Sequence, residues 1–80
     1  MFSTRYKERN NVCGTKVVQI RRSIHPFMSQ SKMADLLQLA GMECDRHVVR
    51  RIENGKRFVT DIELKIIAES LGVSADILLQ

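Results

Sequence analysis

Cysteine and histidine are scarce in this chain, and their spacing argues against two kinds of small domain. The 80 residues include two of each, namely Cys13, His25, Cys44 and His47. Two cysteines are too few for the disulfide framework of a small secreted domain. No pair of the four has the C-x2–4-C or H-x3–5-H spacing of a zinc site. We therefore expect two small buried thiols, no bound metal and no cofactor.

Long hydrophobic runs and phosphate-binding motifs are also missing. No apolar run approaches the roughly 20 residues that a membrane-spanning helix needs, and the chain begins without the apolar stretch of a secretory signal. The four glycines form neither a P-loop nor a dinucleotide-binding fingerprint. The acidic residues are scattered singly and mostly stand where helix caps are expected. We therefore expect a cytoplasmic protein without catalytic activity.

Basic charge is gathered into two blocks of the sequence. The formal net charge is +4 and the isoelectric point is about 9.5. Residues 1–25 hold six lysines and arginines against one acid, and residues 46–57 hold five against one. Residues 58–80, by contrast, carry more acids than bases. Clustered basic charge is typical of a surface that meets a polyanion, although a merely solvated surface has the same composition.

Short helical patterns fill the chain, and no segment shows the sustained alternation of a strand. Apolar residues recur every three to four positions, with capping residues such as Ser29, Asp45 and Thr60 before them and glycines after them. The expected helices cover residues 15–24, 30–40, 46–53, 61–70 and 75–79. They predict an all-α domain over residues 13–80, preceded by a flexible basic arm over residues 1–12.

The helix expected over residues 46–53 has two different faces. Val49 and Ile52 point inward at helical spacing, and this leaves a basic outward face. That face carries Arg46, His47, Arg50 and Arg51. An α-helix fits the major groove of B-DNA, where arginine can bind guanine through two parallel hydrogen bonds. The small Ala34, on the preceding helix, would let the two helices cross closely beside Val49.

Three motifs in order carry a resemblance to a known family. They are Met28-Ser-Gln-Ser-Lys-Met-Ala34, Asp45-Arg-His-Val-Val-Arg-Arg-Ile-Glu-Asn-Gly-Lys-Arg57 and Ile66-Ile-Ala-Glu-Ser-Leu-Gly-Val-Ser-Ala-Asp-Ile-Leu-Leu79. Together they resemble the phage repressor/Cro type of helix-turn-helix protein, the XRE family, over about residues 12–80. The resemblance implies a five-helix, lambda-repressor-like helix-turn-helix domain that binds operator DNA and regulates transcription.

The resemblance also implies roles for individual residues. The base-reading positions would be Arg46, His47, Arg50 and Arg51. The phosphate-contacting positions would be Ser29, Gln30, Asn54, Lys56 and Arg57. Gln30 would in addition brace the recognition helix, and Glu53 would be structural, because its charge repels phosphate.

The chain departs from the common family pattern in two stretches, one of which is the slightly long turn from Arg22 to Ser29, with Pro26. The segment from Ser29 to Ile52 is about five residues longer than usual, so the second helix and the following turn, 36–44, are expected to be extended. A branch of the family has such an insertion followed by a motif like Val59-Thr-Asp-Ile-Glu-Leu64. The insertion changes the expected angle of the recognition helix but not the register from Asp45 onward.

The expected partner is double-stranded DNA with a palindromic operator, bound by a homodimer that acts as a transcriptional repressor. Ile77, Leu78 and Leu79 offer one candidate dimer surface, with ordinary packing as the alternative. The arm over residues 1–12 could reach the minor groove. The main alternative function is an antitoxin or adaptor, in which the same fold binds a second protein. RNA binding is disfavoured, since the aromatic residues do not interleave with the basic helix as a stacking platform does.

Overall fold

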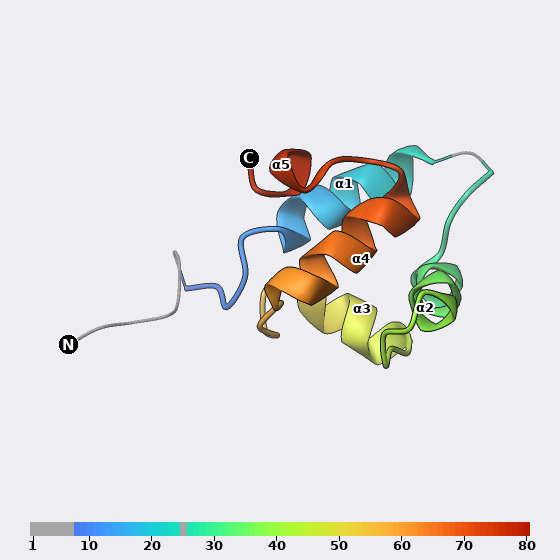
Figure 1. The fold of residues 1–80 in the computed structure, drawn as a ribbon, viewed down its shortest axis with the longest axis horizontal. Coiled ribbons are helices and arrows are strands. Elements are labelled where there is room, and N and C mark those ends of the chain that lie inside the picture. The colour runs from blue at the N-terminus through green and yellow to red at the C-terminus, as the bar shows by residue number, and fades with distance from the viewer. Residues whose placement is uncertain (1–7, 25) are drawn as a thin grey trace.

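Five helices joined by loops make up the computed structural model, which describes residues 8–24 and 26–80. They are α1 (Gly14–Ser23), α2 (Gln30–Leu39), α3 (Arg46–Glu53), α4 (Asp61–Leu71) and α5 (Ala75–Leu78), and Figure 1 shows them in order. The described residues contain no strand, which confirms the predicted all-α class. Each predicted helix end lies within one residue of the observed end.

Helix ends follow the capping residues of the sequence in most cases. The Asp45 side chain accepts a hydrogen bond from the Val48 amide, and Thr60 and Glu63 form a reciprocal capping box at the start of α4. Gly72 ends α4 with a φ of 72°, a left-handed conformation that favours glycine. Ser74 precedes α5 as predicted, but its side chain makes no capping hydrogen bond.

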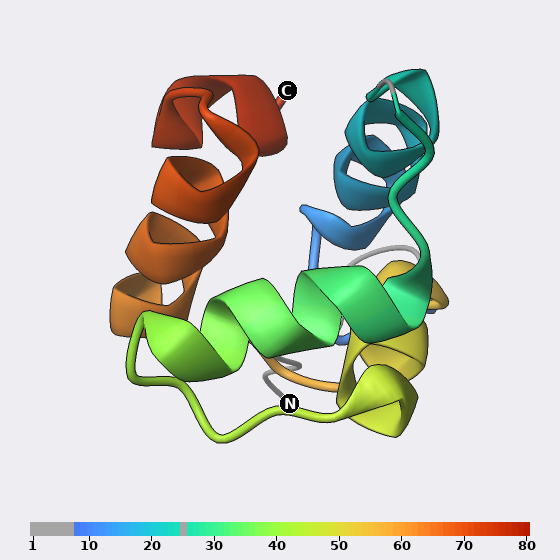
Figure 2. The ribbon, with the colours of Figure 1, turned by 90° about the vertical axis from the view of Figure 1, so that its right-hand side faces the viewer.

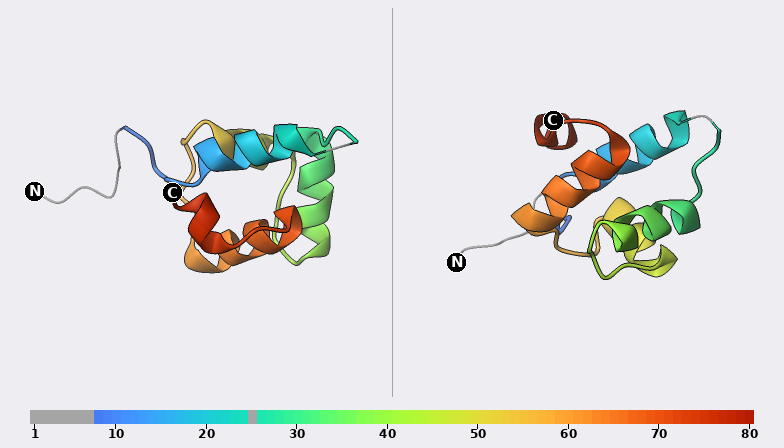
Figure 3. Two further views of the ribbon diagram at one scale, coloured as in Figure 1. Left: turned by 90° about the horizontal axis from the view of Figure 1, so that it is seen from above. Right: turned by 45° about the vertical axis from the view of Figure 1, so that its right-hand side comes forward.

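Every helix contributes at least one fully buried side chain to a single core. These side chains are Val17, Met33, Leu37, Val49, Ile52, Ile67 and Leu78. Helices α1 and α4 lie on opposite sides of the core and α2 spans one end between them (Figures 2 and 3). Helix α3 packs against α2 and α1. Because its inward residues are fully buried, the orientation of α3 is fixed by the core.

A turn over residues 40–45 connects α2 to α3. Helix α2 ends at Leu39, and Gly41 reverses the chain with a φ of 100°. Met42 and Cys44 then fold into the core, and the Gln38 amide donates a 2.6 Å hydrogen bond to the Cys44 carbonyl. The 40–45 segment is therefore packed on the core, and it fixes the start of α3.

The expected arm differs from the structure at its C-terminal end. Asn11 is buried, and residues 9–11 are hydrogen-bonded to the end of α3 and the loop after it. These three residues of the predicted arm are therefore packed on the helical domain, because their polar groups bond to its backbone carbonyls. Residues 1–7 of the predicted arm lie outside the described residues.

Both cysteines are free and buried, as predicted, and burial raises the pKa of each thiol. No helix in the described part of the chain is long and apolar enough to cross a membrane.

Candidate nucleic-acid interface

The outward face of α3 carries four basic side chains, and the inward face anchors the helix in the core. Val49 and Ile52 are fully buried on the inward face. The exposed residues are Arg46, His47, Arg50 and Arg51. Among the described residues these four side chains have no hydrogen-bond or ion-pair partner. Their hydrogen-bond donors are thus available to an external ligand.

The dimensions of this face suit a groove of nucleic acid. An α-helix with its side chains is about 10–12 Å across, and the major groove of B-DNA is about 12 Å wide. Arg46 and Arg50 are one helical turn apart, so their guanidinium groups project from the same side. Such a spacing allows both to reach base edges from one docked helix.

A buried ion pair holds the C-terminal end of α3 against α1. Two donors of the Arg21 guanidinium bind the Glu53 carboxylate, at 2.6 Å from Nε to Oε2 and 3.0 Å from Nη2 to Oε1. Only 5% and 7% of the two side chains are exposed. The remaining Nη1 donates to the Met28 carbonyl at 3.0 Å. Glu53 is thus structural, as the resemblance implied.

Arg21 lies in the first basic block of the sequence, but it does not add to the charge of the surface. Arg21 follows Val17 by four residues and therefore lies on the buried face of α1. Its exposed neighbour Arg22 belongs to the surface charge. The helical spacing indicates that Arg21 is buried and Arg22 exposed, but it does not indicate which acidic residue pairs with Arg21.

The start of α2 brings two further predicted residues to α3. The Gln30 amide nitrogen donates a 3.0 Å hydrogen bond to Oε1 of Glu53, so Gln30 joins α2 to α3. Ser29 caps α2 by accepting a hydrogen bond from the Lys32 amide at 3.0 Å. Both residues are half-buried, and each keeps a donor hydrogen that these contacts do not use.

The three predicted phosphate-contacting residues in the loop after α3 differ in their hydrogen-bond partners. Asn54 accepts a hydrogen bond from the Lys56 amide through Oδ1 at 3.1 Å, and the Lys56 side chain is exposed without a partner among the described residues. Arg57 instead forms a two-pronged pair with Glu63, at 3.0 and 2.9 Å. The Arg57 guanidinium holds the pKa of the Glu63 carboxyl below its usual value. Lys56 is therefore the more available cation of this loop.

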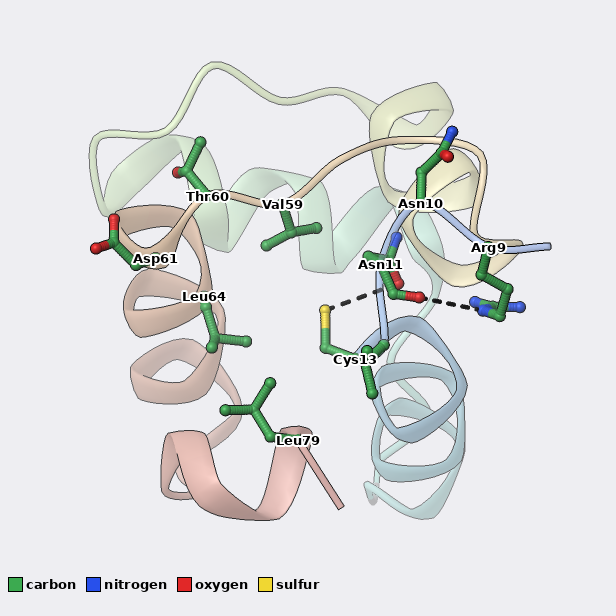
Figure 4. Close-up of a pocket in the computed structure, with 10 residues that line it drawn as sticks. Arg9, Asn10, Asn11, Cys13, Val59, Thr60, Asp61, Leu64 and Leu79 are labelled. Atoms are coloured by element: carbon green, nitrogen blue, oxygen red, sulfur yellow. Dashed lines mark hydrogen bonds between the residues drawn. The ribbon is translucent and has the colours of Figure 1, made fainter. Parts of the chain in front are cut away.

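An apolar groove of about 330 Å³ lies between α4 and the chain that leads into α1. Its walls come from residues 9–13 on one side and residues 59–64 on the other, and Leu79 reaches it from the C-terminal end of the chain (Figure 4). Val12 and Leu79 are 40% and 51% exposed. The predicted apolar C-terminus is thus divided, since Leu78 is fully buried whereas Ile77 and Leu79 reach the surface.

No group of three or more potential metal ligands occurs among the described residues, which do not include His25.

Compared with known proteins, the chain matches no family model, no curated protein and no solved structure at a significant level.

Proposed function

We propose that this protein binds double-stranded DNA in a sequence-specific manner and acts as a transcriptional repressor. The observation that carries the proposal is the outward face of α3, where exposed cationic side chains have no internal partner while the opposite face is fully buried. A rigid helix with free donors at one-turn spacing is suited to reading base edges. In this reading Arg46, His47, Arg50 and Arg51 face the bases.

Contacts to the DNA backbone would flank α3 on two sides. Ser29 and Gln30 lie at the start of α2 and keep unused donors, and Lys56 extends from the loop after α3 with Asn54 beside it. Phosphate contacts of this kind set the position of the recognition helix and supply affinity on any sequence. Arg57 would add to them only by leaving or sharing its contact with Glu63.

We further propose that the protein binds a palindromic operator as a homodimer. A single module of this size buries roughly 600–1,000 Å² on DNA, which favours two copies on half-sites about one helical turn apart. The apolar groove with exposed Val12 and Leu79 offers a surface for such pairing that leaves the cationic residues of α3 uncovered.

Selection from random duplex DNA tests the proposal. The wild-type protein is expected to enrich a palindromic consensus, and the Arg46→Ala/Arg50→Ala double variant is expected to lose it. The matched control is Arg22→Ala/Lys65→Ala, which removes the same charge from exposed positions on α1 and α4. Loss of the consensus in the control, or its persistence in the α3 variant, would contradict the assignment of the reading face.

Salt dependence separates this function from the alternative of an antitoxin or adaptor that binds a second protein. Binding without a consensus, and with a steep loss of affinity between 50 and 200 mM salt, indicates a basic surface only. That outcome would favour the protein-interaction module.

A further inference from the structure

Residues 9–11 form a strap that binds the end of α3 and the loop after it. Five backbone carbonyls between residues 52 and 57 accept hydrogen bonds from these three residues. The Arg9 guanidinium donates to the Glu53 carbonyl at 2.9 Å, and the Asn10 amides donate to the Gly55 and Lys56 carbonyls at 2.8 and 3.0 Å. The last carbonyls of a helix lack partners within the helix. The strap donates hydrogen bonds to two such carbonyls of α3, those of Ile52 and Glu53.

Asn11 is the centre of this arrangement. Its side-chain nitrogen donates to the Ile52 carbonyl at 3.0 Å and to the Arg57 carbonyl at 2.7 Å, so that both amide hydrogens are used. Its side-chain oxygen accepts from the Gly14 amide at 2.8 Å. One buried side chain thus joins the start of α1, the end of α3 and the far end of the loop that carries Lys56.

The strap fits so closely that two positions require glycine. A Cβ atom at Gly14 would overlap the Ile52 carbonyl oxygen, and one at Gly55 would lie 2.6 Å from the Arg9 guanidinium carbon. Gly55 also has a φ of 81°, which a side chain would strain. The loop between α3 and α4 is therefore fixed from the N-terminal side as well as by its own hydrogen bonds.

We infer that Asn11 is a positioning residue for phosphate binding, because it holds the 54–57 loop in the conformation that presents Lys56 beside the recognition helix. The inference rests on the proposed function and deepens it. Asn11 itself would not touch DNA, since its side chain is buried and its hydrogen bonds are used within the protein. Its effect passes through the loop.

The Asn11→Asp variant tests the inference with little change in size. The carboxylate keeps an acceptor for the Gly14 amide but cannot donate to the Ile52 and Arg57 carbonyls. The full-length variant is titrated with a duplex bearing the selected consensus at several salt concentrations. Its log–log salt slope is expected to be shallower than that of the wild type by about 0.9, the value of one lost phosphate contact.

Two comparisons distinguish positioning from general stability. Lys56→Ala is expected to give the same shallower slope, and the Asn11→Asp/Lys56→Ala double variant is expected to be no shallower than Lys56→Ala alone. Val17→Ala, a core change in α1, serves as the control that lowers the melting temperature but keeps the wild-type slope. Amide hydrogen exchange reads the loop without DNA, and faster exchange at Gly55 and Lys56 is expected in Asn11→Asp but not in Val17→Ala.

The outcomes separate this inference from the proposed function. A wild-type slope in Asn11→Asp, unchanged loop exchange, or slopes that add in the double variant would overturn the positioning role while DNA binding stands. Absence of DNA binding by the wild-type protein would overturn both, and the exchange data would then describe a structural clasp only.

Discussion

The two sides of α3 are built in opposite ways. On the outward side, arginines and a histidine project into solvent without internal partners among the described residues. At the inward C-terminal end, Glu53 receives donors from Arg21 and Gln30, and the backbone carbonyls receive donors from residues 9–11. The buried atoms of this short helix therefore carry its stability, whereas its exposed side chains are free for the contact with DNA that we propose. Substitutions on the two sides are therefore expected to have separable effects.

The strongest test of the inward side is Arg21→Ala. Removing this partner leaves the Glu53 carboxylate buried without its cation, which costs about 3–5 kcal/mol of unfolding free energy. Urea denaturation at neutral pH measures the loss. The neighbouring Arg22→Ala variant is the control, and its exposed position predicts a change within about 0.5 kcal/mol. Equal losses in the two variants would show that the buried pair does not anchor α3.

A smaller effect is expected from Gly14→Ala, which probes the packing of α1 on the end of α3. Alanine normally stabilises a helix relative to glycine by about 1 kcal/mol. Here the added Cβ meets the Ile52 carbonyl oxygen, so the sign is reversed and about 1–3 kcal/mol is lost. Thermal unfolding followed by circular dichroism measures it, with Thr15→Ala as an exposed control in the same helix. A stabilised Gly14→Ala protein contradicts the close approach.

The outward side is tested by Arg50→Ala, which sharpens the comparison because two quantities are measured. Unfolding free energy is expected to change by less than about 0.5 kcal/mol, since the side chain is exposed and unpartnered. Affinity for the consensus duplex is expected to fall by about 1–3 kcal/mol, with little change on a scrambled duplex. Fluorescence anisotropy gives both affinities. A uniform loss on both duplexes would assign Arg50 to phosphate instead of a base.

The smallest effect concerns the ion pair of Arg57 and Glu63, whose side chains are 25% and 20% exposed. The pKa of Glu63 is lowered in the folded protein, so its stabilising contribution is present above the unfolded value of about 4.3 and is lost as pH falls through the lower folded value. A surface pair of this kind contributes about 1 kcal/mol or less. Urea denaturation is compared for the wild type and Glu63→Gln from pH 7 to pH 3.

The two unfolding curves are expected to differ at neutral pH and to converge in acid. Glu69→Gln, an exposed change on the same helix, serves as the control and is expected to follow the wild type. A constant difference between wild type and Glu63→Gln across this pH range would show that the ion pair does not carry the effect.

Much of the fold followed from the sequence because its signals are local. Helical spacing identified the inward residues Val49 and Ile52, and the Thr60–Glu63 capping box and Gly72 marked the ends of α4. The outward residues of α3 were predicted by the same spacing, and they are exposed as expected. These features depend on residues within a few positions of one another.

Other features depended on contacts between distant parts of the chain. The pairing of Arg21 with Glu53 spans 32 residues, and that of Asn11 with the Ile52 carbonyl spans 41. No local pattern distinguishes an asparagine in a solvated arm from one that closes a helix end. The pairing of Arg57 with Glu63 spans only 6 residues, but it joins a loop to α4, so helical spacing does not indicate it.

The sequence by itself determined that this chain forms five short helices, one of which has a basic outward face, because periodicity and capping act over a single turn. Only the tertiary structure decided which charges remain free and which are consumed. A buried charge or amide is stable only with a partner, and that partner is supplied by whichever segment the fold brings beside it.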